Sequence, residues 1–226
     1  MNMKIALVVL LAIALAFCDL IVEPSQKYMA DEFGRKRVFH GVNAVYKVAP
    51  FHPIYDHFHP NSSLCDEDFQ NLKNWGINVV RLYVAWEGVM PQRNTYSKEY
   101  VEHLRNIVRK AANYGVQVLL DAHQDLYNRK FCGEGFPDWA IASDKSFPMP
   151  VAKSIPKDEK GYPIIKECLK RLFGVYYMAF DVGKSFQDLY ENKNGLADEF
   201  ANMWKFVVSN LKDEPNVIGK NFHFLL

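Results

Sequence analysis

The fold of this chain is decided by residues 75–84, Trp-Gly-Ile-Asn-Val-Val-Arg-Leu-Tyr-Val. The stretch after the glycine is apolar and rich in β-branched residues, which is typical of a parallel strand buried on both faces. Glycine is also the residue that most readily takes the left-handed conformation at the end of a helix. The stretch therefore predicts a helix that ends at Gly76 and a central strand that follows at once.

Similar signals precede this stretch. Segments 28–31 and 38–42 flank a predicted hairpin turn at 32–35, and the second of them predicts a first buried strand. Ser63 can cap the helix that ends at Gly76. The apolar face of this helix consists of Phe69, Leu72 and Trp75.

The pattern repeats after the stretch. Ser97 can cap a second helix, which Gly115 ends, and a strand is expected over 116–121. A third helical pattern covers 197–211 and is followed by a strand that begins at 217–219. The apolar positions of the second helix recur every three or four residues: Val101, Leu104, Ile107, Val108, Ala111 and Ala112.

Strands that alternate with helices through short turns predict a parallel sheet, either a closed eight-unit barrel or an open doubly wound sheet. No Gly-x-Gly-x-x-Gly follows the first strand, and polar residues gather where the strands end, which favours the barrel. We therefore predict an α/β fold over 28–219: an incomplete (β/α)8 TIM barrel of about three units and the start of a fourth strand.

Composition predicts one globular core and excludes several partner classes. The 226 residues are 49% hydrophobic and carry a formal net charge of +1, with Lys and Arg scattered along the chain. This gives no overall electrostatic footprint for nucleic acid or an anionic membrane, and no stable protein partner is predicted.

Residues 1–18 resemble a cleaved signal peptide, because Lys4 precedes an apolar run over 5–17 that is too short to span a bilayer. Secretion, or delivery to a lysosome-like lumen, is expected. Asn61 lies in an Asn-Ser-Ser sequon within a loop and is a candidate for glycosylation.

Without the leader, the chain keeps Cys65, Cys132 and Cys168, which predicts one disulfide and one free thiol in an oxidising compartment. No Cys-x-x-Cys spacing supports a zinc site. The histidines of segment 52–59 are interrupted by prolines and lack ligand spacing, so no metal is predicted.

Candidate binding residues follow the predicted strands. They are Asn43 and Lys47 after the first, Arg81 in the second, and His123 and Asp125 after the third. The vicinal hydroxyls of a sugar need such paired donors and acceptors, although a plain solvated strand end is the alternative. A guanidinium among apolar residues is costly without a carboxylate partner, so Arg81 is expected to orient an acidic group or to form a purely structural pair.

Aromatic and acidic residues leave alternatives open. Tyr83, Trp86 and Trp139 present flat faces for stacking sugar rings, or they belong to the core. Glu87 and Glu134 lie near strand ends, but nothing in the sequence requires them to meet at the roughly 5 Å that a retaining glycosidase needs. They are not assigned as a catalytic pair.

Four blocks together resemble one family. Residues 41–47 (Gly-Val-Asn-Ala-Val-Tyr-Lys), 75–82, 121–125 (Asp-Ala-His-Gln-Asp) and 131–139 (Phe-Cys-Gly-Glu-Gly-Phe-Pro-Asp-Trp) look like the endoglycoceramidases of glycoside hydrolase family five. The resemblance implies a retaining β-glycosidase that cuts between oligosaccharide and ceramide, with a glycosphingolipid substrate, transient membrane contact and no cofactor. It implies that the sugar is held by Lys47, His123 and Asp125. Asn43 belongs to the first of the four blocks and is a further candidate for binding the sugar.

The resemblance also implies that Arg81 supports the nucleophile, and it stops after Gly219. In the family the fourth strand continues into Asn-Glu-Pro, whose Glu is the acid/base, and the nucleophile Glu comes later. Residues 220–226 diverge, so we expect a truncated tail, neither catalytic Glu, and an inactive chain. The alternatives are a non-catalytic glycolipid-binding fragment, a glucosylceramidase, or another family-five β-glycosidase.

Residues 126–195 interrupt the third unit and include many apolar side chains. Such an insertion forms either a lid that contacts lipid chains or a segment that packs on a small core of its own.

Overall fold

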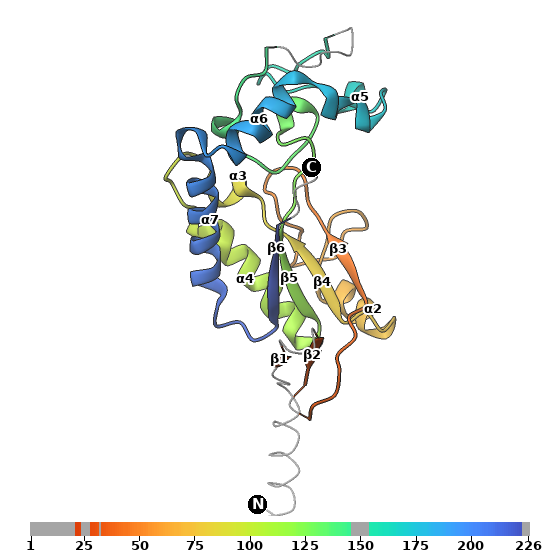
Figure 1. Ribbon diagram of the computed structural model, residues 1–226. Helices are drawn as coiled ribbons and strands as arrows, with labels where there is room; N and C mark the ends of the chain where they lie inside the picture. The colour runs from red at the N-terminus through yellow and green to blue at the C-terminus, as the bar shows by residue number, and fades with distance from the viewer. Residues whose placement is uncertain (1–20, 24–27, 32, 146–153, 223–226) are drawn as a thin grey trace, which may run out of the picture.

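The computed structural model describes residues 21–23, 28–31, 33–145 and 154–222 (Figure 1). A four-stranded sheet occupies the centre, and short helices and loops gather beyond one end of its strands. The strands are β1 (Ile21–Glu23), β2 (Tyr28–Ala30), β3 (Gly41–Ala44), β4 (Val79–Tyr83), β5 (Gln117–Ala122) and β6 (Val217–Phe222). The α-helices are α2 (Asp66–Asn74), α3 (Trp86–Val89), α4 (Lys98–Asn113), α5 (Ile165–Cys168), α6 (Phe180–Tyr190) and α7 (Leu196–Leu211). Four 3₁₀ helices complete the described elements: η1 (Arg129–Phe131), η2 (Asp138–Ala140), η3 (Phe173–Met178) and η4 (Lys193–Gly195).

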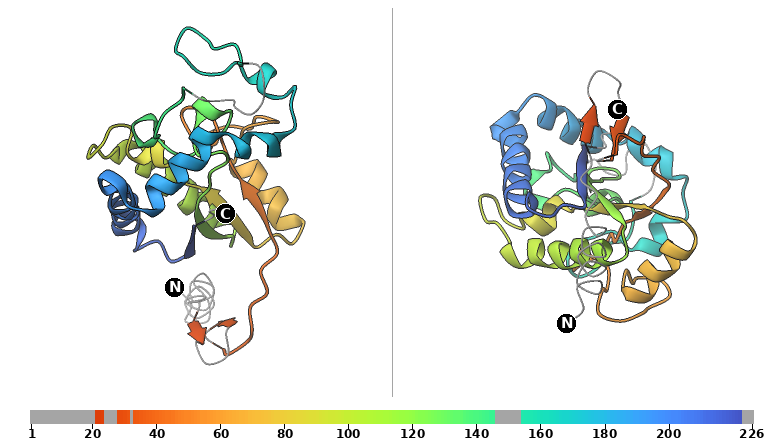
Figure 2. Two further views of the ribbon diagram at one scale, coloured as in Figure 1. Left: turned by 45° about the horizontal axis from the view of Figure 1, so that its top comes forward. Right: turned by 90° about the horizontal axis from the view of Figure 1, so that it is seen from below.

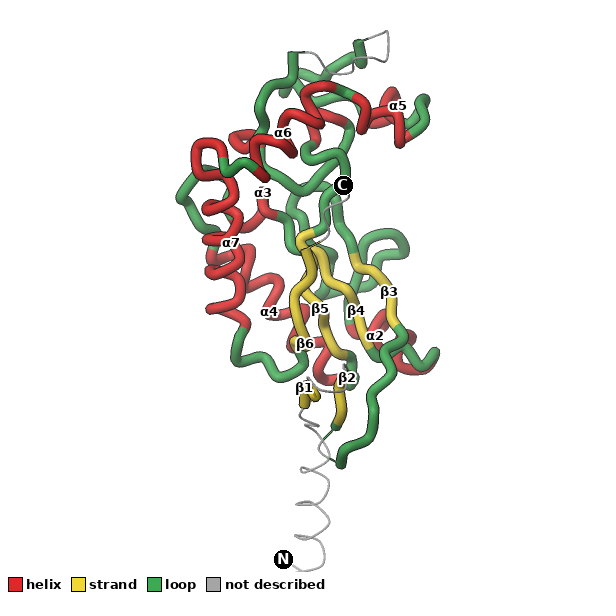
Figure 3. Tube along the Cα trace, in the orientation of Figure 1, coloured by secondary structure: helices red, strands yellow, loops and turns green. Residues whose placement is uncertain are grey.

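The sheet is parallel throughout, with the strand order β3-β4-β5-β6. Residue Arg81 of β4 lies opposite Asn43 of β3, and Tyr83 lies opposite Asp121 of β5. The carboxyl ends of all four strands therefore point to the same end of the molecule, which confirms three strand-helix units and a fourth strand. The tube view shows the separate β1–β2 hairpin at the opposite end (Figure 3).

Helices α2, α4 and α7 form an arc along one side of this sheet (Figure 2). Side chains on that side are buried, including Val80 and Leu82 of β4. Strand β4 pairs with β3 and β5 and is central, as expected. Val79 and Arg81 are only partly buried, so its second face is less buried than the first. Helices on one side alone are the arrangement of a barrel wall, whereas a doubly wound sheet carries helices on both sides.

Local signals placed most helix ends correctly. The Ser97 side chain accepts a hydrogen bond from the backbone N–H of Tyr100, and Gly76 and Gly115 both adopt positive φ. The first helix differs, because its N-cap is Cys65 rather than Ser63. Trp75 is also 71% exposed, since it caps the end of α2 and lies beyond the turns that face the core.

The first strand of the sheet is shorter and more exposed than predicted. Hydrogen bonds between Asp31 and Arg35 confirm the turn, but the strand begins only at Gly41, and Val38 and Val42 are exposed. The physical reason is that, among the described strands, β3 pairs with β4 alone and lies at the edge of the sheet.

The fourth strand continues past Gly219. Lys220 pairs with Leu120, and Phe222 pairs with Ala122 of β5, so the first residues of the predicted tail belong to the sheet. Residues 223–226 and the predicted signal peptide, 1–18, lie outside the described residues. Within the described part of the chain, no helix has the length and apolar character to cross a membrane.

The insertion between β5 and α7 is attached to the main core. Cys132 and Cys168 form a disulfide, and Cys65 is the free, buried thiol, as the odd count predicted. Buried insertion residues such as Tyr176 and Val182 belong to the same apolar cluster as Leu82 of the sheet. The expectation of a separate small core was therefore wrong.

We predict that replacing both Cys132 and Cys168 by Ser lowers the free energy of unfolding by roughly 3 to 4 kcal/mol, because the bond closes a loop with a sequence separation of 36. Urea unfolding measures the loss. The matched control is Cys65→Ser, which removes a buried thiol but no bond and should have a much smaller effect. Equal urea midpoints for the double variant and the parent would contradict the prediction.

Candidate functional site

Arg81 and Asp121 begin a continuous set of charged contacts at the carboxyl ends of the strands. The Arg81 Nη2 atom lies 2.8 Å from Oδ2 of Asp121, whose side chain is fully buried. The same Asp121 oxygen lies 3.5 Å from Nδ1 of His123. The predicted acidic partner of Arg81 is thus Asp121, and β4 and β5 together position the His123 ring.

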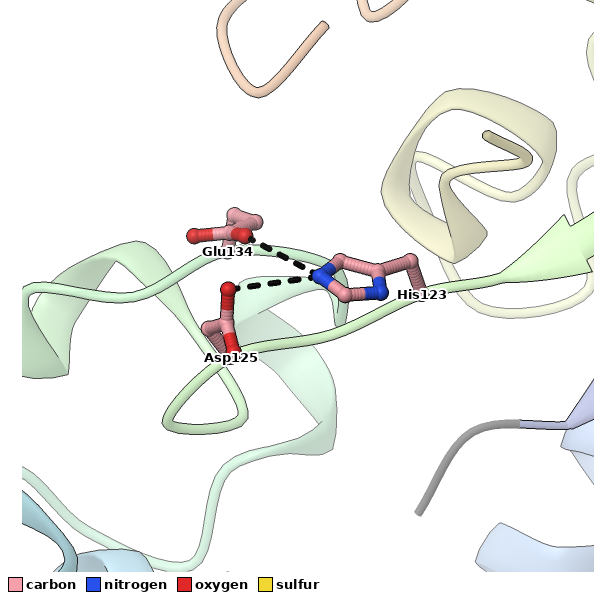
Figure 4. A group of neighbouring side chains, drawn as sticks. All are labelled: His123, Asp125 and Glu134. Carbon is pink, nitrogen blue, oxygen red and sulfur yellow. Dashed lines mark hydrogen bonds and ion pairs between the residues drawn. The ribbon is translucent and has the colours of Figure 1, made fainter. Parts of the chain in front are cut away.

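Lys47 reaches the same place from the loop after β3. Its Nζ atom donates a 2.7 Å hydrogen bond to Oδ2 of Asp125 and lies 2.5 Å from Oε1 of Glu134. His123 Nε2 is 3.3 Å from Oδ2 of Asp125 and 4.0 Å from Oε1 of Glu134 (Figure 4). The structure therefore brings Lys47, His123 and Asp125 together as predicted, with Glu134 among them.

Glu134 is held against Asp125 by the backbone. The two residues exchange N–H···O hydrogen bonds of 2.8 and 3.2 Å in an isolated antiparallel bridge. Glycines flank Glu134 on both sides because there is no room for side chains. A Cβ atom at Gly133 would lie 1.9 Å from the Asp125 carbonyl oxygen, and one at Gly135 would lie 2.8 Å from that of His123.

The pKa values of these groups reflect both burial and their neighbours. Hydrogen bonds to Asp121 and Asp125 raise the pKa of His123 to about 9, so the imidazole is protonated at neutral pH. Burial opposes ionisation of Asp125, but hydrogen bonds from His123, Lys47 and Glu134 outweigh it and lower the pKa. Burial likewise disfavours the charged Lys47 ammonium, yet the two carboxyl groups raise its pKa.

Glu134 differs from Asp125 although the two touch the same lysine. Burial raises the pKa of its carboxyl to about 7, against the opposing effect of Lys47, and the neighbouring Asp125 carboxylate raises it further. A protonated Glu134 donates a hydrogen bond to ionised Asp125. The pair therefore shares one proton and presents a donor and an acceptor side by side near neutral pH.

His123, Asp125 and Glu134 also have the residue types of a metal site, and one ligand atom from each lies within 4.8 Å of the others. The Lys47 ammonium contacts both carboxyl groups and supplies the positive charge that a cation would bring. This arrangement suits the hydroxyl groups of a polar ligand better than a divalent ion. The prediction of no metal was made on other grounds and stays a prediction.

Two predicted residues lie outside this set of contacts. Asn43 lies beside Arg81 in the sheet register and is exposed, and among the described interactions none joins it to the charged residues. Asn61 is exposed in a turn, so its glycosylation stays a prediction. The histidines of segment 52–59 do not converge, since His52 stacks on His103 while His57 pairs with Asp56.

The predicted aromatic platforms are mostly core residues. Tyr83 and Trp86 are each 1% exposed, so neither offers a face to a sugar. Trp86 packs edge-on against Phe136 and Trp139, and the Trp139 indole donates to the Met90 carbonyl. The stacking interpretation was wrong for Tyr83 and Trp86 because the insertion covers the end of β4.

Sequence reasoning missed the place of Glu134 and the partner of Glu87. Glu87 is buried against Arg129, 2.9 Å from its Nε atom, and burial raises the pKa of Glu87 to about 7. Glu134 points instead to Lys47. The signal for Glu134 was the pair of glycines around it, which permits close approach to another backbone.

An apolar hollow of about 730 Å³ lies along α6, lined mainly by Tyr177, Val182, Phe186 and Tyr190. Tyr177 connects it to the charged residues, because its hydroxyl accepts a 3.3 Å hydrogen bond from the N–H of Leu126, next to Asp125. The hollow therefore begins one hydrogen bond away from the residue that follows Asp125.

Known families and proteins resemble this chain in sequence. Residues 42–220 match the model of the family described as cellulase, glycosyl hydrolase family 5. The chain belongs to glycosyl hydrolase family 5. An endoglycoceramidase from Hydra vulgaris is 41% identical over 201 residues, and one from Cyanea nozakii is 39% identical over 201 residues.

The fold of this family 5 chain is that of solved relatives. Endo-glycoceramidase II from Rhodococcus sp., determined as a lactosyl-enzyme intermediate, superposes with a TM-score of 0.66 at 21% identity. The match covers 88% of this chain and 43% of that one. Its α/β fold is thus the TIM-barrel fold of these enzymes, of which this chain forms an incomplete barrel with four strands.

The chain spans about two fifths of the length of its curated relatives. The alignments cover 88% of this chain in both cases, but 39% of the Hydra protein and 40% of the Cyanea protein. All the charged residues described above lie in the part that the family model matches.

We predict that the Glu134 carboxyl titrates near pH 7. In carboxyl ¹³C NMR spectra, Glu134→Gln removes one signal that titrates there, and Lys47→Met shifts that signal to a higher pKa because the ammonium no longer favours the anion. The signal of Glu87, which is raised by its own burial, is the internal control and stays in place in both variants. A Glu134 signal that titrates near 4.3, as in an unstructured peptide, would contradict the prediction.

The same shift makes stability depend on pH. The pKa of Glu134 is higher in the folded protein than in the unfolded chain. Its contribution to the free energy of unfolding is therefore fully present below about pH 4.3 and is lost as the pH rises through about 7. We expect the urea midpoint to fall less steeply between about pH 5 and 8 in Glu134→Gln than in the parent.

Proposed function

We propose that the protein is a glycosphingolipid hydrolase of the endoglycoceramidase type, and that this chain supplies the surface that grips the sugar next to the ceramide. The observation that carries the proposal is the charged group of Lys47, His123, Asp125 and Glu134, joined through Tyr177 to an apolar hollow. An amphiphilic substrate needs both kinds of surface in contact. The substrate acted on is inferred from the endoglycoceramidase relatives.

The charged residues suit the polar half of such a substrate. Lys47 and protonated His123 are donors, Asp125 is an acceptor, and Glu134 changes from donor to acceptor near neutral pH. Charge-assisted hydrogen bonds to neighbouring hydroxyl groups are stronger than neutral ones and fix the orientation of the ring. We place Asn43 at the margin of this surface, beside Arg81.

The hollow along α6 suits the apolar half. Its lining is dominated by Tyr177, Val182 and Phe186, with few polar groups. Because Tyr177 is hydrogen-bonded to the residue after Asp125, a substrate bound across the two places would have its sugar–lipid junction near Asp125. This arrangement favours a glycolipid over a wholly polar glycan.

The hydrolytic carboxylates are proposed to lie outside these residues. Asp121 is paired with Arg81, Asp125 and Glu134 with Lys47, and Glu87 with Arg129, so each acidic group around the site already has a cation. A retaining mechanism needs a free nucleophile and a proton donor about 5 Å apart. The lactosyl-enzyme intermediate of the Rhodococcus relative supports the covalent route.

In this proposal Arg81 positions Asp121 and His123, and it also supports the nucleophile once the polypeptide that bears it is in place. We further propose that the protein works outside the cytosol, in a secreted or lysosome-like setting. The Cys132–Cys168 disulfide and the exposed Asn61 sequon support that location.

We predict that this 226-residue chain binds lactosylceramide in detergent micelles more tightly than ceramide, measured by surface plasmon resonance. Lys47→Met and Asp125→Asn should each weaken that preference by on the order of tenfold, because each removes a charged group that is proposed to bind the sugar hydroxyls. The matched control is Lys212→Met, an exposed lysine at the end of α7.

Mass spectrometry of the same samples tests whether the chain hydrolyses lactosylceramide. We expect intact lactosylceramide after incubation with the 226-residue chain, and released lactose only with a longer form of the protein that has the length of its relatives. Equal binding of ceramide and lactosylceramide would overturn the sugar site. Release of lactose by this chain would overturn the assignment of the carboxylates to other polypeptide.

A further inference from the structure

The Asn61-Ser62-Ser63 sequon lies in a turn that is fixed by hydrogen bonds. The carbonyl oxygen of His59 accepts hydrogen bonds from the backbone N–H groups of Ser62 at 3.3 Å and Ser63 at 3.2 Å. The Ser63 hydroxyl donates to the same oxygen at 2.8 Å. The Ile54 N–H donates to the Ser62 carbonyl at 2.9 Å and thereby ties the turn to the preceding loop. Asn61 is therefore held at a defined place on the surface.

The side chain of Asn61 is available for modification. Asn61 is exposed, and its described hydrogen bond uses the backbone N–H, which lies 3.4 Å from Nδ1 of His59. None of the described residues forms a hydrogen bond with its side-chain amide. A glycan attached to this amide nitrogen would thus cost the folded protein no described contact.

Phe58 lies three residues before Asn61 and is 47% exposed. Among the described residues, no aromatic ring or cation packs against its face. Phe58 and Asn61 line the same hollow of about 440 Å³, together with Asn71 and Leu72 of α2. Single exposed phenylalanines are common on protein surfaces. This one differs because it shares a hollow with a glycosylation sequon.

The first sugar of an N-linked glycan suits an aromatic neighbour. That sugar is β-N-acetylglucosamine, whose ring substituents are all equatorial, so its axial C–H groups form an apolar face. The face of an aromatic ring is electron-rich and attracts such C–H groups. The hydroxyl groups project from the rim of the sugar, where they meet water or a polar side chain such as Asn71. The turn folds the chain back after His59, which brings a sugar on Asn61 within reach of Phe58.

We propose that Asn61 carries an N-linked glycan whose first N-acetylglucosamine packs on the face of Phe58 and stabilises this turn. The inference goes beyond the proposed function and rests on it in one respect, the setting outside the cytosol that gives the sequon access to glycosylation. The contact involves neither Lys47 nor Asp125. Binding of lactosylceramide should therefore be the same in Asn61→Gln and the parent.

The first test measures the modification itself. The 226-residue chain is expressed in animal cells, and mass spectrometry of its peptides gives the occupancy of Asn61 in both the secreted and the retained protein. We expect a glycan that is absent from Asn61→Gln and from Ser63→Ala, which lacks the hydroxyl of the sequon. An unmodified Asn61 in both fractions would overturn the proposal.

The second test measures the contact by urea unfolding of the glycosylated chain. Asn61→Gln should raise the equilibrium constant for unfolding by on the order of fivefold, the scale of one aromatic contact. Phe58→Leu keeps an apolar side chain but lacks the aromatic face, so Asn61→Gln should have little further effect in that background. The double-mutant cycle cancels any effect of Phe58 that does not involve the glycan.

The matched control is Phe173→Leu, because Phe173 lies in the insertion and is also 47% exposed. The effect of Asn61→Gln should be undiminished in that background. NMR adds a direct measurement: ring currents should shift C–H signals of the first sugar upfield in the parent, and these signals should return to their free positions in Phe58→Leu.

An effect of the glycan that is equally large in Phe58→Leu and the parent would overturn the proposal, as would its disappearance in Phe173→Leu. An endoglycosidase that leaves one N-acetylglucosamine on Asn61 should preserve the stabilisation, and a loss on trimming would exclude the first sugar as the contact. The full cycle in a chain that binds ceramide and lactosylceramide equally would support the glycan contact and refute the proposed sugar site.

Discussion

The pairing of Arg81 with Asp121 is the interaction on which the rest of the site depends. Asp121 is fully buried at the end of β5, and a buried carboxylate without a cation would be strongly destabilising. Arg81 provides that cation from the neighbouring strand, on the partly exposed face of the sheet. Because the same Asp121 oxygen also meets His123, the register of two parallel strands fixes the first side chain of the charged group.

From His123 outward, each charge is stabilised by the next. Asp125 ionises despite its burial because His123 and Lys47 contact it, and Lys47 stays charged because two carboxyl groups contact it. Glu134 is the group in which burial is not overcome, so it holds a proton near neutral pH. The result is a set of fixed donors and acceptors without a large excess of charge, which suits uncharged hydroxyl groups better than ions.

Much of this could be predicted from the sequence, where the determining forces are local. Gly76 and Ser97 marked helix ends because turn conformation and capping depend on neighbouring residues. Trp75 and Val38 were misplaced because burial depends on which elements pack nearby, and an edge strand or a helix end has few neighbours. Polar residues at strand ends were found because parallel topology brings them to one edge.

The sequence could not predict which residue Glu134 contacts or which cysteines form the disulfide. Glu134 meets Asp125 through a backbone bridge across an irregular turn. The glycines beside Glu134 signal a close approach to another backbone, but they do not say which one. The three cysteines that follow the predicted leader allow three pairings, and the packing of the insertion selects Cys132 with Cys168. The sequence could give the number of bonds but not their geometry.

The same disulfide gives the site and the insertion a common mechanical support. Glu134 follows Cys132 by two residues, and Cys168 is the last residue of α5. The glycines beside Glu134 leave no slack against the backbone of residues 123–126, since any added Cβ would collide with it. The disulfide therefore links α5 covalently to the loop that holds Glu134 against Asp125. The geometry of the charged group and the position of α5 therefore depend on the same loop.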